Sequence, residues 1–203
     1  EAKPIPGTEE AFHPFFSPDG RWVGFFTGNK MKKVSLLGGE PVILCDARNP
    51  FGASWGSDDT IVFADAEGAR LLRVQAAGGT AQLVATEDPV KGKGPFHWPE
   101  ILPGGKAVIY NTRARIAVLS LATGERRILV EGGANARYVP SGHLTFTRAG
   151  SLLAVPFDLA RLEVTGAPVP ILEGVRIESY GAGQLSFSSD GSLVYFPGAA
   201  VDS

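Results

Sequence analysis

A Gly-x-Ser-x-Gly pattern at Gly52-Ala-Ser54-Trp-Gly56 is the first candidate for chemistry in this chain. In hydrolases this pattern places a nucleophilic serine on a sharp turn between a strand and a helix. Here a polar turn and a second short apolar segment, residues 61–63, follow the motif, and no helical pattern does. We therefore interpret Ser54 as part of a strand and predict no catalytic residue from it.

The three histidines, His13, His97 and His143, are the next candidates. None has a second histidine or a carboxylate at a spacing typical of metal ligands. His13 and His97 each precede an apolar segment, where a histidine commonly bonds to the backbone of a turn. We predict no metal and no cofactor.

Carboxylates and glycines also occur in turns. Ser17-Pro-Asp-Gly20 and Ser189-Asp-Gly191 lack the dense acidic series of a calcium loop. Gly92-Lys-Gly94 lies in the long connection 88–95 with no helix behind it, so it does not predict a phosphate cradle. The length of this connection suits a contact with a partner.

These motifs belong to a repeating unit. An aromatic or large aliphatic residue leads a polar turn and a short apolar segment five times, at Phe16, Trp55, Ile101, Tyr138 and Phe187. We call these the lead residues. A second turn marker recurs at Gly39, Gly79, Gly124 and Gly166. A repeat of this length that contains only strands and turns predicts a β-propeller.

The predicted fold is all-β, a β-propeller of about five repeats with four-stranded antiparallel blades. In the first repeat we expect strands at 13–16, 21–26, 32–37 and 41–44. The inner strands are apolar at successive positions, as expected for sheets covered on both faces. The predicted blades are 12–46, 48–88, 94–132, 133–174, and 180–203 combined with 1–8.

The two ends of the chain leave two readings of the last blade. Residues 3–8 resemble the outer strands predicted at 41–46 and 168–173, so they could complete the blade begun at 180–203 and close the propeller. The alternative is that the chain is a piece of a larger propeller. Unpaired blade edges would then favour self-association.

Composition excludes several classes of protein. Lys and Arg number 19 against 21 Asp and Glu, and no basic block occurs, so we expect no nucleic-acid binding. Cys45 is the single cysteine, which excludes an intrachain disulfide. No apolar run reaches about 20 residues, so this segment is not expected to insert into a membrane.

The turns Ser17-Pro-Asp-Gly20 and Ser189-Asp-Gly191 resemble the TolB-type, WD-like propeller repeat. The fourth repeat, through 136–144, 154–158 and 162–166, is similar to propellers fused behind bacterial serine/threonine kinases. This resemblance implies a sensor or interaction module that follows a membrane span, and hence a periplasmic location. The residues themselves leave the cytoplasm open, and they contain no kinase motif.

Glu100 and Arg137 occupy equivalent positions, one residue before the lead residue of adjacent repeats. Equivalent residues of adjacent blades lie close together around a propeller axis, so we expect an ion pair or a shared water network. The alternative is a purely structural pair without function.

We predict a non-catalytic module that binds a protein, peptide or small molecule. The predicted binding residues are His13, Arg48, Trp98, Glu100, Arg137 and Tyr180. One alternative is an accessory propeller that gates substrate for a prolyl-oligopeptidase-like hydrolase. A third hypothesis, glycoside or lactone chemistry by the blades themselves, would need carboxylates or a metal converging on the channel.

Overall fold

The computed structural model describes residues 3–87, 94–113, 115–178, 182–188 and 191–198. All regular structure in these ranges is β-strand, which confirms the predicted all-β class. No candidate membrane-spanning helix is present among these residues. The chain divides into two compact units, 1–108 and 109–203, with the division inside one strand.

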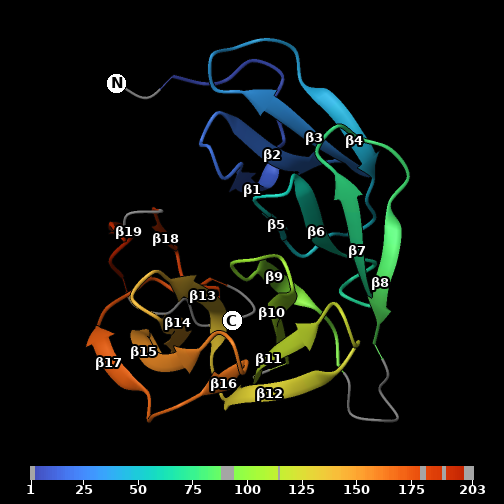
Figure 1. The fold of residues 1–203 in the computed structure, drawn as a ribbon. Coiled ribbons are helices and arrows are strands. Elements are labelled where there is room, and N and C mark those ends of the chain that lie inside the picture. Colours follow the sequence, from blue (N-terminus) through green and yellow to red (C-terminus); the bar gives the residue numbers. More distant parts are fainter. Residues whose placement is uncertain (1–2, 88–93, 114, 179–181, 189–190, 199–203) are drawn as a thin grey trace. The chain divides into compact units, whose positions relative to one another are not determined.

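The first unit contains two complete four-stranded antiparallel sheets, each in chain order (Figure 1). The first sheet consists of β1 Phe12–Phe16, β2 Trp22–Thr27, β3 Lys30–Ser35 and β4 Val42–Asp46. The second consists of β5 Ala53–Trp55, β6 Thr60–Asp65, β7 Arg70–Gln75 and β8 Gln82–Thr86. These sheets confirm the predicted four-stranded antiparallel blades.

The third strand begins and ends two residues earlier than predicted. Thr27 already pairs with Lys30 across a two-residue loop, so β3 starts at Lys30. It ends at Ser35 because the Ser35 carbonyl accepts the N–H of Gly38 at 3.0 Å and closes the next turn. Gly38 has a positive φ of 96°, which glycine adopts without steric cost.

A third four-stranded sheet contains the division between the units and consists of β9 His97–Ile101, β10 Ala107–Thr112, β11 Arg115–Ser120 and β12 Arg126–Glu131. The next sheet lies in the second unit and consists of β13 Ala134–Val139, β14 His143–Arg148, β15 Ser151–Asp158, β16 Glu163–Val164 and β17 Val169–Leu172. It has five strands where four were predicted. Strand β15 has eight residues, enough to pair with β17 at one end and with β16 at the other.

The last sheet in the described residues is the hairpin of β18 Leu185–Phe187 and β19 Leu193–Tyr195. The segment expected to complete it, residues 3–8, forms turns rather than a strand. Pro4 and Pro6 lack backbone N–H donors, and the Thr8 hydroxyl instead donates to the Ile5 carbonyl at 2.7 Å. Closure of the propeller and self-association through unpaired edges stay predictions.

The repeat alignment is visible in five turns. In each turn, the carbonyl of the residue that follows a lead residue accepts an N–H from three positions later, at 2.9–3.1 Å. The accepting residues are Ser17, Gly56, Leu102, Val139 and Ser188. The donor has a positive φ in every case, and it is glycine in four turns and Asp59 in the other. The need for a left-handed residue therefore explains why Asp-Gly or its equivalent recurs.

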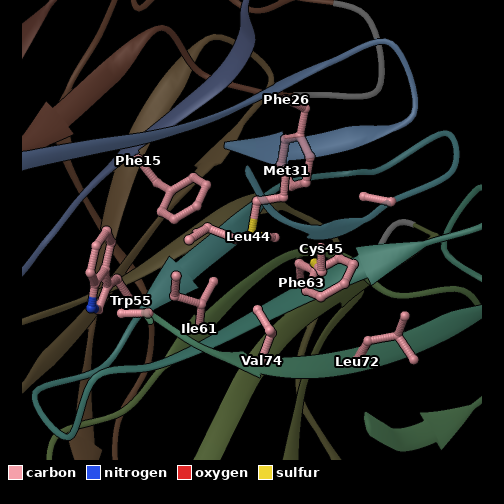
Figure 2. Close-up of a cluster of buried hydrophobic side chains, with 12 residues drawn as sticks. Phe15, Phe26, Met31, Leu44, Cys45, Trp55, Ile61, Phe63, Leu72 and Val74 are labelled. Atoms are coloured by element: carbon pink, nitrogen blue, oxygen red, sulfur yellow. The ribbon is translucent and has the colours of Figure 1, made fainter. Parts of the chain in front are cut away.

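The core of the first unit lies between its two complete sheets (Figure 2). Phe26 of β2 packs against Phe63 of β6 with ring centroids 6.3 Å apart. Ile61, Val62 and Phe63 are successive residues of β6 and all are fully buried. Because side chains alternate between faces, this burial shows that both faces of β6 are covered, as predicted.

Two leucines at opposite extremes of burial test how much the burial of side chains in these sheets contributes to stability. Leu71 is fully buried in β7, whereas Leu37 is 95% exposed in a turn. We expect Leu71→Ala to lower the free energy of unfolding by about 2–5 kcal/mol, since it removes buried methyl groups and leaves a cavity. Leu37→Ala should change it by less than about 0.5 kcal/mol. Urea denaturation measures both, and equal losses would contradict the assigned core.

A close approach of ring to backbone fixes the register of the first hairpin. Phe15 pairs with Gly24 across β1 and β2, and its ring lies where a Gly24 side chain would be. A Cβ built on Gly24 would come within 2.2 Å of the Phe15 ring. Only glycine therefore fits opposite this ring.

We expect Gly24→Ala to destabilise the chain by about 1–3 kcal/mol through overpacking. In a Phe15→Ala background the same change should cost much less, because the ring that it strikes is gone. A double-mutant cycle measured by thermal denaturation gives the coupling. Additive effects of the two substitutions would show that the contact does not govern stability.

Candidate functional site

The inner strands share a bend near their starts. The residue three positions before the lead residue has a positive φ in four repeats: 48° at His13, 90° at Gly52, 46° at Trp98 and 54° at Asn135. The pairing register of β1 shifts between Phe12 and Phe15, and that of β13 shifts between Ala134 and Arg137. A β-bulge of this kind redirects side chains at the end of a strand. Non-glycine residues there cost roughly 1–2 kcal/mol each.

In the first unit these bends bring aromatic and imidazole rings together. We call the rings of Phe12, His13, Phe51, His97 and Trp98 the entrance cluster. Phe51 stacks on His97 with centroids 4.5 Å apart, and His13 lies 6.4 Å from Phe51. His97 and Trp98 meet edge to face at 5.7 Å.

Backbone contacts hold the entrance cluster in place. The Trp98 N–H donates to the Phe51 carbonyl at 2.8 Å and so joins the start of β9 to the segment before β5. A Cβ on Gly52 would lie 3.2 Å from both Cα and Cδ1 of Trp98. Gly52 therefore has two roles. It adopts the left-handed backbone conformation, and its lack of a side chain leaves room for the indole of Trp98. This is the physical role of the first glycine of the Gly-x-Ser-x-Gly pattern.

Burial favours the neutral form of both histidines of the entrance cluster. Desolvation lowers the pKa of His13 below its usual value, and it lowers the pKa of His97 in the same way. A hydrogen bond with the Glu67 backbone opposes part of the effect on the pKa of His97. Neutral imidazoles carry one donor and one acceptor each, so the cluster offers apolar faces with a few polar atoms. This combination suits recognition of an aromatic or aliphatic side chain.

In the second unit, Asn135 occupies the position three residues before the lead residue and has a different role. Asn135 is buried, and its backbone N–H donates to Asn111 Oδ1 at 2.9 Å. Its side-chain amide donates to the Gly183 carbonyl at 3.0 Å. A buried amide with these partners ties loops together, so Asn135 is a structural residue. The left-handed position by itself therefore does not mark a binding residue.

Ser54 has a structural partner too. Its hydroxyl accepts the Ile101 N–H at 3.0 Å, which links inner strands β5 and β9. The motif is followed by a turn and β6, not by a helix. Both observations support the interpretation of Ser54 as a strand residue. Among the described residues, no group of three or more histidine, cysteine or acidic side chains could hold a metal ion.

The structure brings only part of the predicted binding set together. His13 and Trp98 lie in the entrance cluster. Glu100 and Arg137 occupy the same register position in β9 and β13, two residues before the turn starts at Leu102 and Val139. They belong to different units, and the ion pair between them stays a prediction. Tyr180 lies outside the described residues.

Arg48 lines a separate hollow of about 410 Å³ with Asp65 and Arg70. Asp65 is 2% exposed, forms an ion pair with Arg70 and accepts the Arg48 backbone N–H. Cys45 lines the same hollow, where burial, Asp46 and Asp65 raise its pKa to about 11. None of the residues described as lining this hollow belongs to the entrance cluster, and a single site that unites the whole predicted binding set stays a prediction.

Sequence reasoning missed Phe51 and assigned His97 no binding role. Both occupy the position four residues before a lead residue, which Phe12 fills in the first repeat. Alignment of the repeats on their lead residues would have shown two phenylalanines and a histidine at one position. That signal was present, but the bend that turns these side chains toward one another was not predictable from residue types.

No protein-family model and no curated protein sequence matches the chain. Several solved structures are similar to it in fold. The calcium-binding protein regucalcin from Agrobacterium tumefaciens has a TM-score of 0.66 and 16% identity, covering 95% of this chain and 68% of that one. TolB from Acinetobacter baumannii has a TM-score of 0.65 and 12% identity, covering 92% and 51%. Virginiamycin B lyase from Staphylococcus aureus has a TM-score of 0.60 and 13% identity, covering 96% and 72%. The likeness is one of fold: the chain has a β-propeller fold and spans about half of TolB.

The lowered pKa values predict how stability depends on pH. Because the unfolded histidines bind protons more readily than the folded ones, stability rises with pH. The contribution is complete above the usual pKa of about 6.5 and falls as the pH drops from there through the lowered folded values. Thermal melting from about pH 5 to about pH 8 should show this slope, and it should flatten in a His13→Gln, His97→Gln variant. His143→Gln, at the start of β14, is the matched control. An equal flattening there would contradict the assignment.

Proposed function

We propose that this chain is a non-catalytic binding module whose protein or peptide ligand contacts the entrance cluster. The observation that carries the proposal is the collection of five partly exposed aromatic and imidazole rings on adjacent strand starts. The bends at His13 and Trp98 hold these rings at the strand starts, where they lie beside Phe51. Aromatic side chains on a rigid scaffold are favourable anchors at interfaces.

The non-catalytic character is part of the same proposal. One neighbour in fold is named a lyase, so the fold alone does not decide between a binding protein and an enzyme. In this chain the Ser54 hydroxyl, the strongest candidate nucleophile, already accepts a backbone N–H. His97 stacks on the Phe51 ring and His13 lies beside the same ring, which favours a contact role over proton transfer.

Two phenylalanines of β1 allow a matched test. Peptides that bind the chain would be selected from a displayed random library, and their affinities measured for each variant. We expect Phe12→Ala, within the cluster, to weaken binding at least tenfold, as for an aromatic hot spot. Phe16→Ala, which removes a 60% exposed ring four residues later on the same strand, should change affinity less than about twofold.

Peptides that bind both variants equally would place the binding surface elsewhere. Turnover by the wild-type chain in esterase, glycosidase or lyase assays would contradict the non-catalytic assignment. Circular dichroism melts of both variants exclude loss of folding as the cause of any change.

The wider setting is proposed on the sequence resemblance. We place the module on the periplasmic side of a bacterial membrane as part of a receptor serine/threonine kinase. The sequence of the full-length gene tests this placement directly. A kinase domain and a membrane span before residue 1 are expected, whereas a hydrolase domain joined to the propeller would favour the substrate-gating role.

A further inference from the structure

A second hollow lies between the first two sheets, at the ends of β1 and β5 that are opposite the entrance cluster. We call it the tryptophan groove; its volume is about 460 Å³, within the roughly 300–1,000 Å³ typical of small-molecule sites. The residues used below are Asp19, Trp22, Lys33, Trp55, Ser57 and Asp59, all of which line it. It lies at the turns that end β1 and β5, whereas the entrance cluster lies where these strands begin.

Lys33 supplies a fixed donor on the wall of the groove. Its ammonium donates to the Ala76 carbonyl at 2.7 Å and lies 4.6 Å from the Trp22 ring and 5.8 Å from the Trp55 ring. Cation–π attraction to two indoles and a hydrogen bond to the backbone restrict this otherwise flexible side chain. An ammonium has three N–H donors, so further donors are available for a ligand oxygen.

Acceptors lie at the two turns. Asp59 Oδ1 accepts the indole N–H of Trp55 at 3.1 Å, which orients that carboxylate beside the groove. Asp19 Oδ1 accepts the Ser17 hydroxyl at 2.6 Å and the Arg21 backbone N–H at 3.1 Å. These bonds hold the pKa of Asp19 below its usual value, with the Ser17 bond as the largest cause. Both turns therefore present carboxylates as acceptors, and Ser57 adds an exposed hydroxyl.

The mixture of charges restricts the class of ligand. A small anion would meet two carboxylates, and a small cation would meet the Lys33 ammonium. Asp19 also forms an ion pair with Arg21 at 3.3 Å. An apolar molecule would still have to desolvate these charged groups without offering them hydrogen bonds. A neutral ligand that carries many hydroxyl groups can donate to the carboxylates and accept from the ammonium at once. Its C–H surfaces can also pack on the partly exposed indole of Trp22, which gains from contact with apolar groups.

We propose that the tryptophan groove binds a neutral saccharide of one or two sugar units. The proposal goes beyond the binding role of the entrance cluster, because no residue of that cluster contributes to the groove. Lys33 and Asp59 act as donor and acceptor for sugar hydroxyls, and Trp22 provides an apolar surface.

Isothermal titration of the whole chain with defined sugars tests the proposal. The probes are glucose, galactose, N-acetylglucosamine, cellobiose and chitobiose, with glycine betaine and acetate as zwitterionic and anionic comparisons. We expect at least one sugar to bind and both comparisons to fail. Lys33→Met should weaken sugar binding about tenfold or more, because it removes a charged hydrogen-bond donor. Lys32→Met, the adjacent residue of β3, should change affinity less than about twofold.

A second variant guards against loss of folding. Asp59→Asn keeps an oxygen that can accept the Trp55 indole N–H but removes the charge, and it should also weaken sugar binding several-fold. Melting curves of each variant accompany the titrations. The proposal is overturned if no probe sugar binds at millimolar concentration, if betaine or acetate binds instead, or if Lys33→Met binds sugars as the wild type does.

Discussion

The sheets of this chain must be covered on both faces, and this requirement shapes the rest of the structure. Strand β6 buries consecutive residues completely, which an isolated sheet in water could not do. Each sheet of the first unit therefore relies on its neighbour, as the contact between Phe26 and Phe63 shows. Such packing favours short strands, tight turns and many repeats over a single continuous core. It also explains why the chain contains 26 glycines, several of which serve as left-handed turn residues.

The same architecture separates stability from recognition. The apolar middle of each inner strand lies in the core, whereas the two ends of the strand lie in loops. In the first unit the strand starts carry the entrance cluster and the strand ends carry the tryptophan groove. Asn135 shows the alternative use of a strand start, because its amide bonds hold loops of the second unit together. A propeller can therefore change what it binds at one end without altering its core.

Much of the fold could be predicted from the sequence, because each repeat contains a recognisable turn motif. The lead residues and the turns behind them followed from Ser-Pro-Asp-Gly and its variants, and five hydrogen-bonded turns confirm that alignment. The strand expected at 3–8 was wrong because two prolines outweighed its resemblance to outer strands. The fifth strand of the fourth sheet, β16, was missed because its two residues carry no pattern.

The candidate sites were harder to predict, since they depend on backbone bends and on pairs of sheets. His13 and Trp98 were predicted as binding residues, but the reason that they meet Phe51 is a left-handed bend that L-residues rarely adopt. The sequence positions of Trp22, Lys33 and Trp55 do not indicate that the Lys33 ammonium would lie near both indoles. Position along the chain also does not reveal that Arg48 lines a hollow with Asp65 and Arg70.

The single sulfhydryl of the chain has a bearing on where such a module can work. Thiol oxidation and mixed-disulfide formation proceed through the thiolate, which Cys45 hardly forms with a pKa of about 11. Its side chain is also shielded, with 7% of its surface exposed. Cys45 is thus expected to react slowly with oxidants and with disulfides. An oxidising compartment would neither cross-link two copies through Cys45 nor damage it, and an added surface cysteine would react alone with a label.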